Sequence, residues 1–346
     1  MKEVRVGIIG LGVGKWHIRG YRSHPAAKVV AIADPDRQRL QAVGDECSIA
    51  NRFETAEEML RNVKLDVVSV ATPNKFHKPL TIAALKAGCH VLCEKPMAMN
   101  AGEARAMLAE AKKARRRLMI NFSYRFSEGA LALKNEVDSG ALGDVYFGRT
   151  IWHRSRGIPG FGGWFGIKKL SGGGPLIDLG VHRLDMALWL MGYPKPVWVL
   201  AGAYDHLARR LSKDTKKAFD VEDLAVGLIK FANGAILEVE ASWAANITEA
   251  EMMETRLLGT KGGLLHRNLK EGYEFKGEIF VERNGKVESV KPRQAKGGPG
   301  SAMYHMVDSV LTGKPHIATG EEGLTVMKLL DAIYLSAAKG KPVSLS

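Results

Sequence analysis

A glycine-rich stretch near the middle of the chain leads into side chains that could hold and move a proton. Pro175 follows three glycines and suits the first turn of a helix. Asp178 and His182 are then four residues apart on one helix face, and Asp185 follows three residues later. A histidine changes charge near neutral pH, so His182 is a candidate general base. Asp185 could contact a substrate or make only a structural hydrogen bond, and the sequence leaves both readings open.

A second candidate segment, Glu94-Lys95-Pro96, follows an apolar stretch at 90–93 that is typical of a buried strand. A lysine at such a position can donate a hydrogen bond to an oxygen that develops negative charge. A Lys-Pro pair by itself is more often a surface turn, so the signal lies in its combination with the histidine segment. Ligands of open parallel sheets bind beyond the carboxyl ends of the strands. The stretch 70–74 brings further polar residues to such an end: Thr72, Asn74 and, just beyond, His77.

The sequence Gly10-Leu11-Gly12-Val13-Gly14-Lys15 lies between the first apolar stretch and the first helical one. The first glycine permits a tight turn, and the second lets the backbone approach a pyrophosphate at the helix N-terminus. The usual third glycine would fall at Lys15, so the fingerprint is imperfect, with Gly14 one position early. A glycine-rich turn without a ligand is the alternative. The predicted dinucleotide contacts in this loop are Gly10, Gly12, Val13, Gly14 and Lys15.

Asp34 ends the next apolar stretch, 22 residues after Gly12. A carboxylate there can accept hydrogen bonds from a ribose 2′-hydroxyl and would repel a 2′-phosphate, which favours NAD over NADP. Arg37 and Arg39 lie close by and could reach a phosphate, which weakens this preference. A turn or helix-capping role ahead of Pro35 is the alternative for Asp34.

The first third of the chain alternates short apolar strands with helices, which predicts a parallel, doubly wound sheet covered on both faces. The expected strands are 4–9, 28–33, 67–70, 90–93 and 118–120, and the expected helices are 15–23, 36–43, 56–61, 76–87 and 101–114.

The pattern changes after residue 121, which predicts domains at 1–121 and 122–346. Asn233-Gly234 reads as a type I′ hairpin turn, and Asn284-Gly285 marks another turn, so the second sheet should be mostly antiparallel within an α+β domain. A glycine-rich loop is expected at 157–174. The expected helices are 130–139, 175–191, 302–311 and 321–338, and the expected strands are 145–152, 197–203, 224–231, 235–242 and 254–258.

Taken together, the segments around Lys95 and His182 resemble the Gfo/Idh/MocA oxidoreductases, and the resemblance covers essentially the whole chain. It implies an N-terminal Rossmann domain, NAD as cofactor, and a hydride transfer between nicotinamide and a ring carbinol of a sugar, glycoside or cyclitol. Carried over to matching positions, the catalytic set is Lys95, Asp178 and His182. In this set His182 takes the hydroxyl proton, Lys95 stabilises the oxygen, and Asp178 orients the substrate. A cis Lys95-Pro96 bond is also expected.

The resemblance implies further contacts near the cofactor for Asn74, His77 and Glu94. Tyr124 and Arg125 match a motif that faces the cofactor and substrate. In the loop after 145–152, aromatic rings could stack on a sugar and cations could bind its hydroxyls or an acidic group, although a structural or oligomer-contact loop is the alternative. The candidates there are His153, Arg154, Arg156 and Trp164.

Composition limits the classes of protein and of binding partner that remain open. The 346 residues are 46% hydrophobic, which suits two folded domains and excludes a disordered chain. A net charge of +13 is compatible with nucleic acid, but the densest cluster, at 112–117, ends an expected helix, where cations suit the dipole. We therefore expect no nucleic-acid partner. Cys47, Cys89 and Cys93 indicate no disulfide framework, and Cys89-His90 with Cys93 lacks a second ligand cluster, so no metal is expected.

The sequence shows no leader pattern and no apolar run of about 20 residues, so we expect no membrane partner and a cytoplasmic location. An open sheet face would suit a homo-oligomer, a dimer or tetramer. Two other functions stay open. One is a non-catalytic sensor of the same fold, against which the intact Lys95, Asp178 and His182 speak. The other is redox-assisted glycoside cleavage, in which transient oxidation permits elimination and NAD is recycled.

Overall fold

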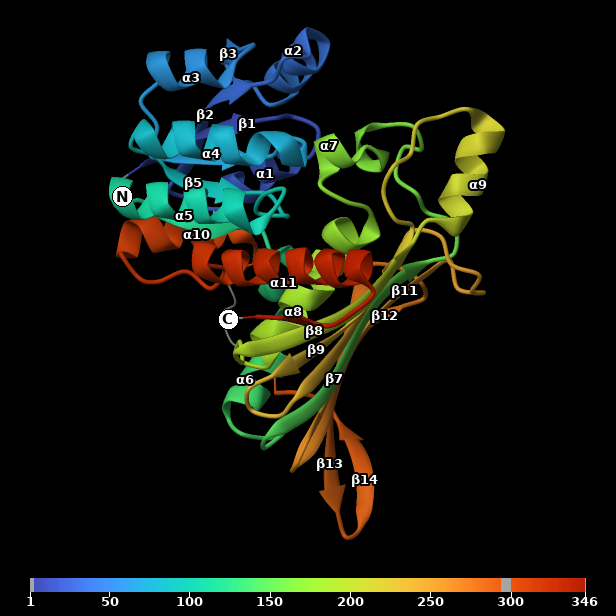
Figure 1. Ribbon diagram of the computed structural model, residues 1–346. Helices are drawn as coiled ribbons and strands as arrows, with labels where there is room; N and C mark the ends of the chain where they lie inside the picture. Colours follow the sequence, from blue (N-terminus) through green and yellow to red (C-terminus); the bar gives the residue numbers. More distant parts are fainter. Residues whose placement is uncertain (1–2, 294–299, 346) are drawn as a thin grey trace. The chain divides into compact units, whose positions relative to one another are not determined.

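The computed structural model describes residues 3–293 and 300–345 (Figure 1). The chain forms two compact units, Met1–Ser123 with Pro299–Met327, and Tyr124–Gly298 with Lys328–Ser346. The first boundary lies two residues from the predicted one. The predicted division also gave everything after residue 121 to the second domain, whereas the structure assigns 299–327 to the first unit.

The first unit is built on a six-stranded parallel sheet with strand order β3-β2-β1-β4-β5-β6. Every residue of β4 is buried, because helices cover the sheet. The strands are β1 (Val4–Ile9), β2 (Ala27–Ala33), β3 (Asn51–Phe53), β4 (Val67–Val70), β5 (His90–Cys93) and β6 (Leu118–Ile120). The helices between them are α1 (Gly14–Arg22), α2 (Arg37–Glu46), α3 (Ala56–Asn62), α4 (His77–Lys86) and α5 (Ala101–Ala114). The predicted doubly wound fold is confirmed, and only the short β3 was missed.

The helices of this unit begin and end at recognisable caps. Asp36, Thr55 and Asn100 each accept a hydrogen bond from the backbone three residues on, at the starts of α2, α3 and α5. At the end of α5, Lys112 and Lys113 occupy the last turn. The basic cluster therefore ends a helix, as the sequence indicates.

The segment that returns to the first unit contains α10 (Ala302–Thr312) and the start of α11 (Gly320–Lys339). A Cβ added to Gly20 of α1 would lie 2.9 Å from the Met303 side chain, so α1 and α10 pack closely. His24 Nε2 and Asp308 Oδ1 are 3.1 Å apart. No local pattern in the sequence links these residues, which explains why the return was not predicted.

The second unit is built on a nine-stranded sheet with strand order β14-β13-β12-β11-β7-β10-β9-β8-β15. Only β7 and β10 pair in parallel, so the predicted mostly antiparallel sheet is confirmed. Its strands are β7 (Val145–Arg154), β8 (Pro196–Tyr204), β9 (Leu224–Phe231), β10 (Ile236–Ser242), β11 (Glu251–Gly259), β12 (Gly262–Leu269), β13 (Glu274–Arg283), β14 (Lys286–Val290) and β15 (Val343–Ser344).

The two predicted turns differ in type. Asn284 and Gly285 both have positive φ, which fits a type I′ turn. At Asn233-Gly234 only Gly234 has positive φ, and the Phe231 N–H donates to the Ala235 carbonyl across a three-residue loop. The type I′ prediction was wrong there, because the loop has one residue more than that turn allows.

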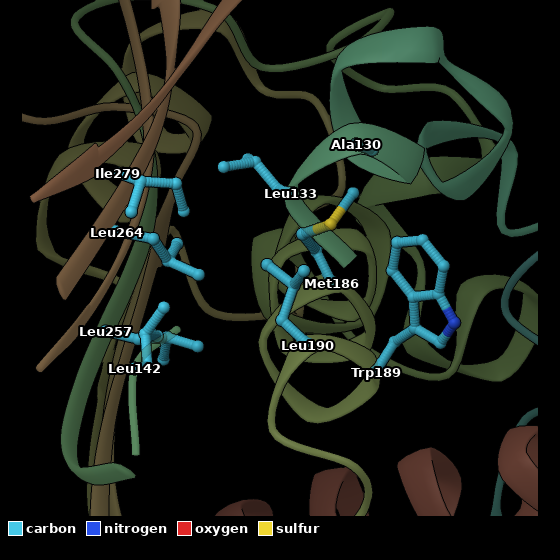
Figure 2. Close-up of a cluster of buried hydrophobic side chains, with 9 residues drawn as sticks. All are labelled: Ala130, Leu133, Leu142, Met186, Trp189, Leu190, Leu257, Leu264 and Ile279. Atoms are coloured by element: carbon cyan, nitrogen blue, oxygen red, sulfur yellow. The ribbon is translucent and has the colours of Figure 1, made fainter. Parts of the chain in front are cut away.

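Helices α6 (Glu128–Asp138) and α8 (Val181–Leu190) pack on one face of this sheet. Figure 2 shows Met186 and Leu190 of α8 facing Leu257 and Leu264 of the sheet. Residues 182, 186, 189 and 190 fall on one helical stripe, so this packing also fixes the direction of His182. The remaining helices are α7 (Lys168–Ser171) and α9 (His206–Thr215), and neither was predicted, since a loop was expected at 157–174.

The predicted helix at 175–191 is not uniform. A π-helical turn, Leu176–Gly180, precedes α8 and contains Asp178. The wider turn changes the angular offset between Asp178 and His182 from that of a regular α-helix, and such turns are frequent at functional sites.

The three cysteines are free and buried. None of the helices within the described ranges is long and apolar enough to cross a bilayer.

Candidate functional site

In the first unit, the predicted residues meet at one edge of the sheet. Gly10 follows β1, Asp34 follows β2, Thr72 follows β4, and Glu94 and Lys95 follow β5. These four strands are neighbours and run parallel, so their carboxyl ends share this edge.

The glycine loop has the geometry that a dinucleotide needs. Gly10 has a φ of +86°, and a Cβ there would lie 2.5 Å from the Ala71 carbonyl oxygen, so only glycine fits. A Cβ on Gly14 would lie 2.9 Å from the Ile8 side chain, so Gly14 performs the helix–strand packing of the usual third glycine. At Gly12 a Cβ would meet nothing within 4 Å, which leaves the backbone open to a ligand. Val13 and Lys15 are exposed beside it.

Asp34 braces this loop. Its Oδ2 accepts a 2.7 Å hydrogen bond from the Leu11 N–H, and its Oδ1 accepts one of 2.9 Å from the Asp36 N–H. Arg39 Nη1 lies 3.3 Å from both carboxylate oxygens. The helix cap is Asp36, so Asp34 is not a cap. Arg37, the other predicted phosphate candidate, pairs with Glu54.

Three predicted cofactor residues follow β4, namely Thr72 and Asn74 and, at the start of α4, His77. Asn74 is buried, and Thr72 Oγ1 is buried without a hydrogen-bond partner in the described part of the chain. This orphaned hydroxyl and the open backbone at Gly12 fit a ligand that brings hydrogen-bonding groups to the edge. His77 differs from the expectation of a cofactor contact. Its Nδ1 lies 2.7 Å from the Pro96 carbonyl oxygen and its Nε2 lies 2.8 Å from that of Thr72, so its ring joins two loops.

The Lys95-Pro96 bond is cis, as the resemblance implies. Lys95 is half-buried, and its N–H donates to Glu94 Oε2 at 3.1 Å. The same carboxylate carries a network that the sequence did not predict, since Glu94 Oε1 lies 2.7 Å from His17 Nε2 and accepts from Asn121 Nδ2 at 2.5 Å. His17 Nδ1 continues to Ser69 Oγ at 3.0 Å.

Glu94 is therefore ionised. Burial alone would raise the pKa of Glu94, but the hydrogen bond and charge of His17, the Asn121 amide and the Lys95 charge outweigh it and lower this pKa to about 2. A fixed negative charge thus stands directly beside Lys95.

In the second unit, Asp178 and His182 lie among aromatic rings. Asp178 Oδ2 accepts a 3.1 Å hydrogen bond from Trp243 Nε1. The His182 ring lies 5.0 Å from the Tyr124 ring and 5.6 Å from the Trp152 ring, measured between centroids. Asp178 is the one half-exposed residue of its π-helical turn, so its carboxylate reaches the surface of this unit. Tyr124 was a predicted neighbour, whereas Trp152 and Trp243 were missed.

The turn that carries Asp178 is fixed by a buried carboxylate. Glu222 accepts hydrogen bonds from the N–H groups of Gly174 and Leu176 at 2.9 and 3.1 Å, and from Tyr334 Oη at 2.9 Å. A Cβ on Gly174 would lie 2.1 Å from the Glu222 carbonyl oxygen, so glycine is required at that position. Burial raises the pKa of Glu222 despite these hydrogen bonds.

Two loop candidates lie near this cluster. Arg154 Nε donates to Glu251 Oε1 at 2.6 Å, and Trp152 Nε1 donates to the same oxygen at 2.6 Å. Trp164 stacks on Phe165 at 3.9 Å, and Phe165 contacts Trp243 edge to face. The structure therefore joins Arg154 and Trp164 to the surroundings of Asp178.

Two other candidates point elsewhere. His153 lies on the opposite face of β7 from Trp152, where its Nε2 is 3.2 Å from Glu240 Oε2, because side chains alternate along a strand. Arg156 donates to the Ala245 carbonyl and to Asn246 Oδ1, so it tethers a loop. The structure does not bring these two side chains to His182.

Arg125 and Asp185 form an internal ion pair. Arg125 is fully buried, and its Nε donates to Asp185 Oδ2 at 2.9 Å and its Nη2 to Oδ1 at 2.5 Å. Tyr193 Oη bonds both. This arrangement matches the structural alternative for Asp185. The contacts of Arg125 with cofactor and substrate stay a prediction.

No group of three or more His, Cys, Asp or Glu side chains within residues 3–293 and 300–345 is placed to hold a metal ion.

The comparisons with known proteins identify the fold and chemistry. A family model described as an oxidoreductase family with an NAD-binding Rossmann fold matches residues 4–122, and its C-terminal α/β companion matches residues 134–345. The chain belongs to the Gfo/Idh/MocA oxidoreductase family. It is an oxidoreductase, and its cofactor is NAD.

Individual relatives agree. The chain is 35% identical to the D-glucoside 3-dehydrogenase of Escherichia coli (strain K12), over 99% of this chain and 97% of that protein. It is similar to the aldose-aldose oxidoreductase of Caulobacter crescentus, solved with glycerol, with a TM-score of 0.84, 28% identity and coverage of 99% and 100%. It is also similar to GenD2 from gentamicin A biosynthesis, solved with NAD, with a TM-score of 0.82, 27% identity and coverage of 100% and 97%.

The charge of Asp34 is expected to set the choice of cofactor. In Asp34→Asn the amide oxygen keeps the bond from the Leu11 N–H, but the charge that repels a 2′-phosphate is gone and Arg39 is released. We expect the ratio of NADPH to NADH affinity to rise about tenfold or more, a change of about 1.4 kcal/mol. Fluorescence titration of each nucleotide measures this ratio. Adding Arg39→Ala should reduce the gain, and an unchanged ratio in Asp34→Asn would show that Asp34 does not face the ribose.

Proposed function

We propose that this protein oxidises a ring carbinol of a sugar, glycoside or cyclitol, or reduces the corresponding ketone, with NAD. The observation that carries the proposal is that Asp178, on a braced turn, and His182, at the start of α8, both lie against aromatic rings. Lys95 lies at the carboxyl edge of the sheet in the NAD-binding unit, beside the predicted cofactor residues. A protein that is 35% identical to this chain is a D-glucoside 3-dehydrogenase.

The residues have distinct roles in this proposal. Bound NAD supplies a hydride acceptor for the carbinol carbon, so the hydroxyl must lose its proton. His182 accepts that proton, Lys95 donates a hydrogen bond to the oxygen as negative charge develops, and Asp178 orients the ring. Residues of the glycine loop, with Asp34 and Thr72, would hold the cofactor.

The groups around Asp178 suit a polyhydroxylated ring. We propose that Trp164 offers an apolar face to the sugar, and that Arg154 binds a hydroxyl or an acidic group. Trp243 keeps the Asp178 carboxylate in position through its indole N–H.

A substrate panel tests the proposal. Purified protein is mixed with NAD and with inositols, free hexoses, methyl glycosides, uronates or phosphosugars, and the absorbance of reduced nicotinamide is followed. Reduction of NAD by a cyclic polyol supports the proposal. Release of an aglycone without net reduction would instead indicate redox-assisted cleavage. Binding of NAD with neither outcome, across the panel and in both directions, would indicate a sensor.

We also propose that the protein is a homo-oligomer, a dimer or tetramer, and acts in the cytoplasm. Leu200 and Leu228 pair in register and are 40% and 37% exposed, on the sheet face that carries Glu238 and Arg149. This exposed leucine pair suits burial against a second copy. Three free cysteines suit a reducing compartment.

A further inference from the structure

Arg183 is the residue after His182, and it is buried without a hydrogen-bonding partner. It is 0% exposed, and none of its three guanidinium nitrogens has such a partner in the described part of the chain. Burial lowers the pKa of Arg183 to about 10, so the side chain still carries its positive charge at neutral pH. The Asp185 charge acts on Arg183 without a hydrogen bond between them. A buried charge that lacks hydrogen bonds costs stability, which suggests that it has a use.

Aromatic rings surround this cation. The Arg183 guanidinium carbon lies 4.8 Å from the Tyr124 ring centroid, 5.3 Å from that of Phe275 and 5.8 Å from that of Trp152. The electron-rich faces of the rings offset part of the cost of burial. They also leave the field of the charge largely unscreened, because they exclude water.

Two of these rings, Tyr124 and Trp152, also contact His182. Its imidazole packs on Tyr124 at 5.0 Å and on Trp152 at 5.6 Å, so cation and base share one Tyr–Trp pair. The effect of the Arg183 charge on a histidine pKa is seen at His266. The pKa of His266, which stacks on Phe275, is lowered to about 3, first by burial and then by the charge of Arg183.

Other charged side chains near the Tyr124–Trp152 pair have hydrogen-bonding partners. Arg154 is paired with Glu251, Arg125 is paired with Asp185, and Asp178 is bonded to Trp243. The titratable and charged groups that surround the Tyr124–Trp152 pair and His182 are Asp178, Arg183, Asp185, Arg125, Arg154, Glu251, His266, Tyr124 and Tyr273. In this set Arg183 is the cation that no carboxylate of the described residues hydrogen-bonds, although the Asp185 charge acts on it.

We propose that Arg183 is a positioning residue whose buried positive charge, acting across the shared Tyr124–Trp152 pair, keeps His182 unprotonated and ready to accept the substrate proton. The inference rests on the proposed function, in which His182 is the base. It adds a group that touches neither substrate nor cofactor and sets the pH range in which the base works.

The titration of His182 tests this directly and needs no substrate. The full chain, labelled with ¹⁵N-histidine, is titrated by NMR, and the His182 signals are assigned by their loss in His182→Gln. In Arg183→Met the midpoint should rise by about one pH unit, because a cation no longer opposes protonation. In Arg183→Lys, which keeps the charge, the shift should be about 0.3 unit or less. Arg256→Met removes a half-exposed cation that is paired with Glu254 on the same sheet, and it should leave the midpoint unchanged.

Replacing a buried unpaired cation by a side chain of similar volume is often neutral or stabilising, so Arg183→Met should fold, and Arg183→Gln is a second neutral variant. The acid limb of kcat/KM with NAD and a methyl glucoside should move upward by the same amount. An unchanged His182 midpoint in both neutral variants overturns the inference. Retained turnover in His182→Ala would instead refute the proposed base, whatever the titration shows.

Discussion

Replacing His182 with alanine is expected to lower kcat about 10³-fold, and Lys95→Ala about 10²- to 10³-fold. Without the imidazole the hydroxyl proton has no positioned acceptor, and without the ammonium the developing charge on the oxygen has no donor. Neither side chain builds the glycine loop, so NADH affinity should stay within about threefold. Stopped-flow reduction of NAD and fluorescence titration of NADH measure the two quantities separately.

Matched controls separate chemistry from folding. His206→Ala on α9 and Lys86→Ala at the end of α4 remove an exposed histidine and an exposed lysine from the same two units, and both should retain wild-type kcat. Exogenous imidazole should restore part of the activity of His182→Ala. Turnover near the wild-type rate in His182→Ala would eliminate it as the base.

Replacing Glu94 with glutamine is expected to destabilise the protein by about 2–3 kcal/mol at pH 7. The amide still accepts from His17, but its NH₂ group would oppose the Lys95 N–H, and the buried charge is lost. The folded-state pKa of Glu94 is about 2, below its ordinary 4.5. Its contribution is therefore fully present above pH 4.5 and is lost as the pH falls toward 2. Thermal melting of both proteins between pH 3 and pH 7 measures the difference.

The two melting curves should converge at low pH. The wild-type protein would lose stability as Glu94 becomes protonated, while Glu94→Gln would lack this component. Asp45→Asn removes a carboxylate that is bonded to Arg52 at the surface, and it should change the melting temperature little at any pH. A constant difference between wild type and Glu94→Gln across the range would show that the ionised form is not what stabilises the network.

Local patterns predicted what depends on local geometry. Continuous apolar runs indicated β1, β4 and β5, and their ends placed Gly10, Thr72 and Lys95 at one edge. The glycines before Asp178 indicated a turn, but the turn is π-helical and is bonded to Glu222, which lies 46 and 48 residues beyond the two N–H groups that it accepts from.

Side-chain partners across the fold could not be predicted in this way. His17 and Glu94 are 77 residues apart, and Arg125 and Asp185 are 60 apart, so no spacing rule links them. His153 was predicted near the substrate because the sequence does not say which face of β7 is covered by a helix. Arg183 escaped notice because an arginine on a helix usually lies at the surface.

The return of α10 to α1 affects how the protein can be made. On the ribosome, the nucleotide-binding half emerges first, yet His24 meets Asp308 only after 284 further residues have been translated. Until then Gly20 of α1 lacks the Met303 side chain that packs against it. A protein cut after Ser123 would therefore lack part of its own first unit.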